Sequence, residues 1–269
     1  MTQSKLRAVS LVAALLAACP GPARPEDPPG RTRRFELSGL YETLSPRDIY
    51  HSWKSFLASF YGGPKTGLTY FFQLGGFSRF EGDAMLGVAG AYKDWGPGFY
   101  TYTALAVGSR SGYMPSFRID HDSNFKLGPG RNIVWTVGLT YIRFFDVHRT
   151  AILSTGLTAY LKGWILTYRV FGNRSDPGRV LSAAHLLDAA AGAEGKRWTN
   201  LTISFGRQAY LATNLARPEE VNKASLSAVL KHRQWIGKKG FGLLAEAGYF
   251  SLKDGYDKFG FSTGFFKEF

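Results

Sequence analysis

The sequence predicts an all-β protein, a closed antiparallel transmembrane β-barrel of about fourteen strands. Aromatic residues make up 15% of the chain, with 21 Phe, 14 Tyr and 6 Trp, and they occur together with 32 Gly. Segments of about ten to thirteen β-branched, aromatic and small residues repeat along the chain, and clusters of turn residues separate them. Barrels with aromatic girdles and tight turns have this composition, whereas helical enzymes seldom do.

Turn clusters rich in Gly, Pro, Asp and Asn divide the chain from residue 34 onward. They stand at 45–48, 62–65, 81–83, 95–98, 128–131, 162–163, 173–178, 192–195, 237–240 and 254–255. Between the clusters, large apolar residues alternate with small or polar ones: Ile133, Trp135, Val137, Leu139 and Tyr141 share one face, and Thr136, Gly138 and Thr140 share the other. This period of two is that of a strand with unlike faces. Val180–Ala193 is rich in Ala and also fits a helix, but we assign it as a strand.

A membrane gives the physical reason for closure. Lipid offers no hydrogen-bond partners, so every backbone N–H and C=O in the bilayer must pair within the protein. A closed sheet meets this requirement because it has no edge strand. The apolar face then points toward lipid and the small, polar face toward the lumen, the reverse of a water-soluble protein.

Residues 1–23 are interpreted as a signal peptide. Lys5 and Arg7 precede an apolar stretch, Ala8–Ala18, that is too short to span a bilayer. The residues that end in Cys19 match a lipobox, which would make Cys19 a lipid anchor, and ordinary cleavage after Ala23 is the alternative.

The remaining chain divides into a flexible leader, residues 24–33, and the barrel, residues 34–269. Cys19 is the only cysteine, so no internal disulfide and no thiolate metal site can form. If the N-terminus is periplasmic, the even-numbered connections are compact Gly/Pro turns on that side. The longer segments 109–115, 172–179 and 210–221 then lie outside the cell, where barrels of this class have their longer loops.

The chain is basic, with a formal net charge of +13 at pH 7. Such a balance is compatible with nucleic acid, but export argues against that partner. The predicted partners are the phosphates of outer-membrane lipids and lipopolysaccharide, or an anionic solute.

The end of the chain resembles the terminal signal by which the barrel-assembly machinery recognises outer-membrane proteins. Ser262, Gly264 and the closing Phe269 fit that pattern, and Phe265 lies on the same face as Phe269. Lys267 departs from it, because an apolar residue is usual at that place.

The stretch Pro115–Asp120, the Gly-Pro turn that follows it and Val134–Tyr141 together resemble the YaiO family of outer-membrane barrels. Tyr168, Asn173 and Leu201–Gly206 fall in comparable places. The resemblance covers most of the mature chain and implies a single outer-membrane barrel. Some relatives act among envelope polysaccharide functions, so the resemblance also points toward polysaccharide export.

The segment Phe117–Leu127 separates into an apolar face and a charged face. The residues expected inside the barrel are Arg118, Asp120, Asp122, Asn124 and Lys126, with Arg169 and Glu246 as further members of this lumen polar cluster. Such a row needs water or partners, because burying an unpaired charge is costly. Two interpretations stay open: an internal network of ion pairs, and a polar lining that selects solutes.

The sequence His121-Asp122-Ser123-Asn124 has the spacing seen in outer-membrane phospholipase A and lipid A deacylases. Residues i and i+2 project from one face of a strand, so His121 could activate Ser123 toward an ester. With the faces of the segment assigned as above, His121 and Ser123 point toward lipid. No third partner is evident, and His121 lies well inside the strand, away from the rim where those enzymes act.

The function predicted from the sequence is therefore non-enzymatic, with no cofactor and no metal. The protein would be either a narrow channel or an accessory of envelope polysaccharide export. The alternatives are a lipid hydrolase that uses His121 and Ser123, and a scaffold anchored to lipid through Cys19. The chain contains no GxGxxG, Walker, HExxH or EF-hand pattern.

Overall fold

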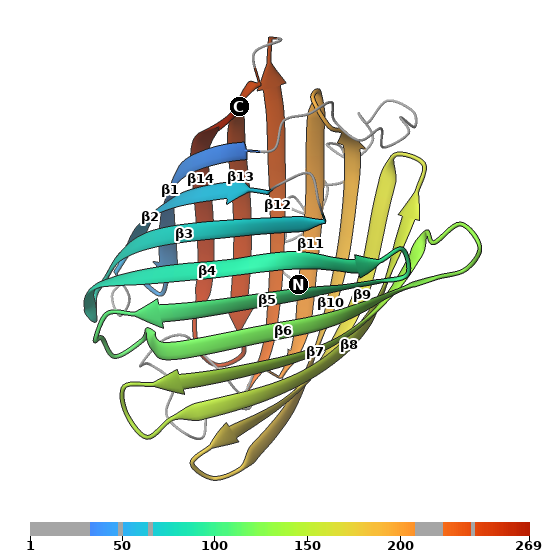
Figure 1. Cartoon of the computed structure of the whole chain (residues 1–269). Helices are drawn as coiled ribbons and strands as arrows, with labels where there is room; N and C mark the ends of the chain where they lie inside the picture. The colour runs from blue at the N-terminus through green and yellow to red at the C-terminus, as the bar shows by residue number, and fades with distance from the viewer. Residues whose placement is uncertain (1–32, 48–50, 64–66, 208–222, 238–239) are drawn as a thin grey trace, which may run out of the picture.

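A computed structural model describes residues 33–47, 51–63, 67–207, 223–237 and 240–269 of the chain. Its fourteen strands close into a single antiparallel barrel, in which every strand pairs with its neighbours in sequence and β1 pairs with β14 (Figure 1). This confirms the predicted fold class and strand number. Across these residues no helix is long and apolar enough to cross a membrane.

The first seven strands are β1 (Arg33–Ser45), β2 (Trp53–Gly62), β3 (Leu68–Arg79), β4 (Gly82–Gly96), β5 (Phe99–Gly108), β6 (Pro115–Leu127) and β7 (Ile133–Phe144). The other seven are β8 (Arg149–Leu161), β9 (Trp164–Asp176), β10 (Val180–Ala193), β11 (Arg197–Arg207), β12 (Ala224–Ile236), β13 (Phe241–Leu252) and β14 (Asp257–Glu268). The proposed signal peptide, the leader up to residue 32 and the loop 210–221 lie outside the described residues, and so does Cys19.

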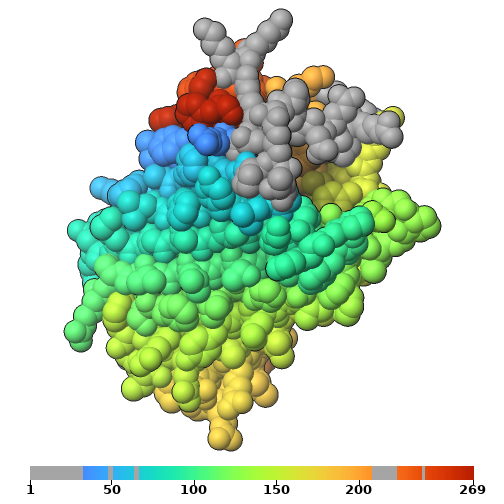
Figure 2. Space-filling view, in the orientation of Figure 1, coloured from blue at the N-terminus to red at the C-terminus, as the bar shows by residue number. Residues whose placement is uncertain are grey.

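Solvent exposure alternates along the strands with a period of two. In β7 the exposed residues Trp135, Val137 and Leu139 alternate with the buried residues Thr136 and Gly138. Because directly paired residues share a face, the register carries each face around the whole barrel. Large apolar side chains occupy the outer face, and in Figure 2 consecutive strands form adjacent bands of side chains over it.

The outer face carries aromatic residues toward both ends. We call the end where β1 begins and β14 ends the terminal rim, and the other end the opposite rim. Outward aromatic residues near the terminal rim are Phe35, Tyr70, Trp95, Phe99, Phe125, Trp135, Trp164, Phe241 and Phe265. Those near the opposite rim are Tyr41, Phe56, Phe117, Tyr141, Phe205, Tyr249 and Phe259. Two such girdles mark the interfaces of a membrane-spanning barrel.

The seam between β1 and β14 is closely packed at a glycine. A Cβ atom added at Gly264 would lie 2.7 Å from Cβ of Ser38 and 2.8 Å from its Cα, and closer still to the carbonyl oxygen of Leu37. Ser262 and Gly264 face the lumen, whereas Phe265 and Phe269 are exposed on the outside. The residues proposed as an assembly signal therefore divide between the two faces of the closing strand.

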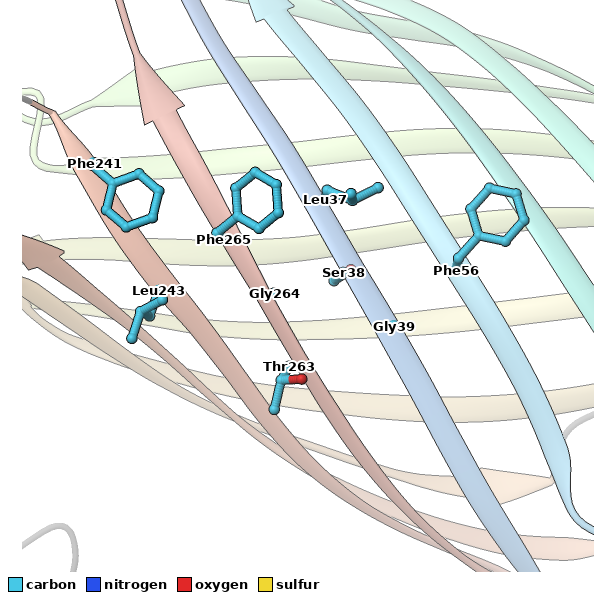
Figure 3. A pocket seen from close by; sticks show the side chains of 9 residues that line it. All are labelled: Leu37, Ser38, Gly39, Phe56, Phe241, Leu243, Thr263, Gly264 and Phe265. Carbon is cyan, nitrogen blue, oxygen red and sulfur yellow. The ribbon is translucent and has the colours of Figure 1, made fainter.

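Apolar side chains cover the outer surface of the seam. Figure 3 shows Phe241, Phe265, Leu37 and Phe56 on four adjacent strands, β13, β14, β1 and β2. Below this row the small residue Gly39 leaves a shallow hollow in the lipid-facing surface (Figure 3).

The turn between β9 and β10 begins later in the chain than the sequence predicts. Residues 173–178 were expected to form a turn, but β9 continues through Asp176 and the connection covers only 177–179. Asn173 and Ser175 are buried on the lumen side, where they hydrogen-bond to Ser182 at 3.2 Å and to Thr150 at 3.0 Å. The polar side chains that suggested a turn are thus part of the inner wall. The Ala-rich segment is strand β10, which confirms its assignment.

Candidate functional site

The inner wall of the barrel is the candidate site, and β6 supplies its most highly charged row. Arg118 donates two hydrogen bonds to the carboxylate of Asp120, from Nε at 2.7 Å and from Nη2 at 2.8 Å. The hydroxyl of Thr140 on β7 donates to the same carboxylate at 2.6 Å. Asn124 accepts a hydrogen bond from Thr136 at 2.7 Å. Each polar group in this part of β6 therefore has a partner within the wall.

Arg169 on β9 connects to β6 across two intervening strands. Its guanidinium donates to Asp122 at 2.9 Å and to Ser154 of β8 at 3.2 Å. The side chain passes over Gly138 of β7, where an added Cβ would lie 2.6 Å from Oγ of Ser154 and closer still to Asp122 and Arg169. The absence of a side chain at Gly138 is what makes room for this ion pair.

The other two charged residues expected in the cluster pair elsewhere. Lys126 lies 3.6 Å from Asp94 of β4, with its ammonium 5.2 Å from the ring centre of Tyr100. Glu246 of β13 pairs with Lys231 of β12 at 3.3 Å. Lys126 and Glu246 therefore form ion pairs with residues that were not assigned to the lumen polar cluster.

Sequence reasoning missed a second charged group, at the terminal rim. Glu36 of β1 contacts Arg34 at 2.7 Å and also pairs with Arg233 of β12. Nearby, the indole N–H of Trp235 donates to Glu268 at 3.0 Å. Glu36 on β1 meets Arg233 on β12 only because the barrel closes, so no local pattern could have indicated this pair.

Near the opposite rim, cations stack on aromatic rings inside the barrel. The guanidinium of Arg79 lies 4.2 Å from the ring centre of Trp53 and 4.4 Å from that of Tyr113. Lys258 lies 4.9 Å from the Trp53 ring and forms an ion pair with Glu42 at 2.6 Å. Such contacts hold cations without an acid for each one.

Aromatic side chains form a strip on the lumen side of β2–β5, in the half of the barrel near the terminal rim. The ring centres of Tyr61 and Phe71 are 6.1 Å apart, Phe71 stacks on Tyr102 at 6.0 Å, and Tyr92 lies 4.8 Å from Tyr102. Tyr100 is on the same face of β5. Tyr92 keeps 45% of its surface exposed, so the strip is open to the lumen. We call these five residues the tyrosine strip.

Charges on the inner wall retain contact with solvent. At mid-height the side chains of Lys231 and Glu246 are 58% and 31% exposed, and Arg118 is 38% exposed. A lumen filled by side chains would have buried these groups.

The charges of the inner wall also balance. The register places on this wall the bases Arg34, Arg79, Arg118, Lys126, Arg169, Lys231, Arg233 and Lys258, and an equal number of acids, Glu36, Glu42, Asp94, Asp120, Asp122, Asp188, Glu246 and Glu268. The basic excess of the chain therefore lies outside the described part of the lumen wall.

His121 and Ser123 lie together on the outer face, as expected. Oγ of Ser123 is 3.5 Å from Nε2 of His121, and Oγ1 of Thr103 is 2.9 Å from its Nδ1. In the described part of the chain the partners of His121 are hydroxyls and not carboxylates. His121 pairs with Leu139 at the middle of the apolar band. No group of three or more His, Cys, Asp or Glu residues that could hold a metal occurs among the described residues.

Comparisons with known proteins agree with this architecture. The family described as YaiO membrane beta barrel domain matches residues 32–211. The fold is similar to the CymD monoaromatic hydrocarbon channel, with 8% identity, a TM-score of 0.55 and 89% of each chain covered. It is also similar to the outer membrane protein Omp33 of Acinetobacter baumannii, with 11% identity and a TM-score of 0.54, over 89% of this chain and 100% of Omp33. Among curated proteins no sequence matches. At these identities the two structures show the fold alone.

Proposed function

Because the chain belongs to the YaiO family of membrane β-barrels, we propose that it is a narrow, water-filled outer-membrane channel for uncharged polar solutes. The observation that carries this proposal is the solvent exposure of the paired charges at mid-height, where Lys231 is 58% exposed. Charged side chains lie on the lumen side of a membrane protein when water or partners are present. Here they have both.

The balance of charge on the wall bears on the kind of solute. A channel lined by an excess of one sign favours ions of the other sign, whereas paired acids and bases leave little net field. We therefore expect weak ion selectivity in the wild-type channel.

The tyrosine strip supports carbohydrate as the solute class. A tyrosine ring offers an apolar face together with a hydroxyl that donates or accepts hydrogen bonds. Sugar rings have the matching character, with C–H groups on their faces and hydroxyls at their edges. A strip of such rings beside polar groups gives an oligosaccharide successive weak contacts along the wall. Weak contacts of this kind let an oligosaccharide move along the lumen, whereas strong contacts would hold it in place. They are also compatible with a role as an accessory of polysaccharide export.

The proposed orientation has the terminal rim in the periplasm. β11 ends at Arg207 and β12 begins at Ala224, both at the opposite rim, and this is the longest interval between consecutive strands; the connection 109–114 also lies at that rim. Long loops face the outside in barrels of this class. The tyrosine strip then lies in the half of the lumen that an exported polymer enters first.

Planar-bilayer recordings test the channel. We expect a steady current that a linear oligosaccharide blocks, and a block roughly tenfold weaker in the double variant Tyr92→Ala, Tyr102→Ala, since losing two ring contacts costs about 1–2 kcal/mol. Tyr141→Ala, on the outer face, is the matched control, and the oligosaccharide should block its current as strongly as that of the wild-type channel. Equal block in all three proteins would refute the role of the strip, and the absence of any current would refute the channel.

The hydrolase remains a second candidate because His121 and Ser123 are in contact. Two observations weigh against it: the partner of Nδ1 is a threonine hydroxyl, and the pair lies in the middle of the lipid-facing band, where hydrolytic water is scarce. We expect purified protein to release no fatty acid from phospholipid or lipid A, and Ser123→Ala to be indistinguishable from wild type. Release that Ser123→Ala abolishes, with the barrel intact, would establish the hydrolase instead.

A further inference from the structure

A cluster of arginines on the outer surface has no role in the lumen. Arg143 ends the outward row of β7, Arg149 begins that of β8, and Arg174 lies on the outward row of β9. All three are exposed at the opposite rim. We infer that these three residues, named here the β7–β9 arginine cluster, bind the phosphate groups of lipid A, the membrane anchor of lipopolysaccharide. The inference rests on the proposed orientation, in which the opposite rim lies in the outer leaflet.

The register brings the three guanidinium groups close together. Arg143 and Arg149 are direct partners across β7 and β8. Arg174 pairs with Ala151, two residues along β8 from Arg149 on the same face. Direct partners are about 5 Å apart at their Cα atoms and diagonal ones about 7–8 Å, so one anionic headgroup can contact all three side chains.

The cluster is short of negative charge. Arg149 lies 3.4 Å from Asp176, and this is the one ion pair that the described residues supply to the three arginines. Like charges directly opposite each other on a sheet repel, so Arg143 beside Arg149 is unfavourable in the protein alone. A bound phosphate converts that repulsion into attraction, and guanidinium groups bind phosphate oxygens in bidentate geometry.

The height of the cluster matches that of lipid headgroups. Tyr141 is the next outward residue of β7 toward the bilayer, and Phe117 of β6 is paired with Arg143. Successive outward-facing residues of a strand are two positions apart, which corresponds to about 5 Å along the membrane normal for a tilted strand. The register pairs Arg143 with Phe117 and, through Ala151, Arg174 with Tyr141, so the cluster lies at the outer edge of the aromatic girdle, where phosphates of the leaflet are found.

Apolar side chains next to the cluster favour a lipid over free phosphate. Leu181 pairs with Arg174 and is 71% exposed. Leu153, the next outward-facing residue of β8 after Ala151 toward the middle of the bilayer, is 65% exposed. Both are on the outer face. An amphiphile whose phosphates reach the arginines can lay its acyl chains along these leucines, which inorganic phosphate cannot do.

Binding of lipid A to the detergent-purified full-length protein tests the inference. We expect saturable binding of diphosphorylated lipid A, at least tenfold weaker in the triple variant Arg143→Gln, Arg149→Gln, Arg174→Gln. The matched control, Arg33→Gln, Lys93→Gln, Arg197→Gln, removes three outward charges at the terminal rim and should bind like wild type. Conductance of the triple variant should equal that of wild type, so failure here is distinguishable from failure of the channel.

Several outcomes would overturn the inference. One is equal lipid A binding by the triple variant and wild type, and another is an equal loss in the terminal-rim control. Binding of lipid A stripped of its phosphates with undiminished affinity would show that phosphate is not recognised. Complete displacement of lipid A by millimolar inorganic phosphate would assign the arginines to a free anion.

Discussion

Replacing Gly264 with alanine is expected to destabilise the barrel more than replacing Gly260, the other inner-face glycine of β14, where an added Cβ would have its nearest neighbour, Cγ of Glu42, at 3.1 Å. The new Cβ would meet the backbone of β1, lying 2.8 Å from Cα of Ser38, and the carbonyl oxygen of Leu37 even more closely. Neither atom can rotate away, so β14 must move from β1 at the pairing that closes the sheet. Overpacking of this kind costs about 1–3 kcal/mol, and here it also weakens hydrogen bonds that the bilayer cannot replace.

Gly248→Ala is the matched control for this substitution. Gly248 faces the lumen on β13, and a Cβ there would have its nearest neighbour, Val229, at 3.8 Å, an ordinary contact. Urea unfolding in vesicles and the gel mobility of unheated samples measure the folded fraction. We expect Gly248→Ala to stay within about 0.5 kcal/mol of wild type, and comparable stability of the two variants would contradict the tight seam.

Arg169→Gln is expected to destabilise the barrel more than substitution of a solvent-exposed lumen charge such as Lys231. Asp122 would keep its charge on the wall and lose its hydrogen-bonded partner, at a cost of about 1–3 kcal/mol. The side chains of both residues are only about a fifth exposed. Lys231→Gln is the comparison, because its pair with Glu246 is much more open to water and such pairs contribute about 0–1 kcal/mol.

The same substitution should change ion selectivity. With Arg169 neutralised, the uncompensated carboxylate of Asp122 favours cations, so the reversal potential in a salt gradient should move toward that of a cation-selective channel. The double variant Arg169→Gln, Asp122→Asn should restore weak selectivity. A reversal potential that the single substitution leaves unchanged would mean that this pair lies away from the conducting path.

The sequence by itself determined the fold class, the approximate strand number and the two faces of the most regularly alternating strands, but the segments near Trp53 and Tyr100 fitted either assignment of faces. Alternation such as that from Ile133 to Tyr141 is local, and the bilayer requires closure of any such set of strands, so no long-range information was needed. The polar row on β6 could be assigned to the lumen for the same reason. The expected turn at 173–178 was wrong because Asn173 and Ser175 have turn chemistry but hydrogen-bond within the wall.

Only the tertiary structure decided which charges meet. Arg169 reaches Asp122 over two strands because Gly138 leaves space, and Glu36 meets Arg233 because β1 returns to β14. Partners of this kind depend on strand register and on closure of the sheet. Both are set by contacts between residues far apart in the chain, which a pattern with a period of two does not encode.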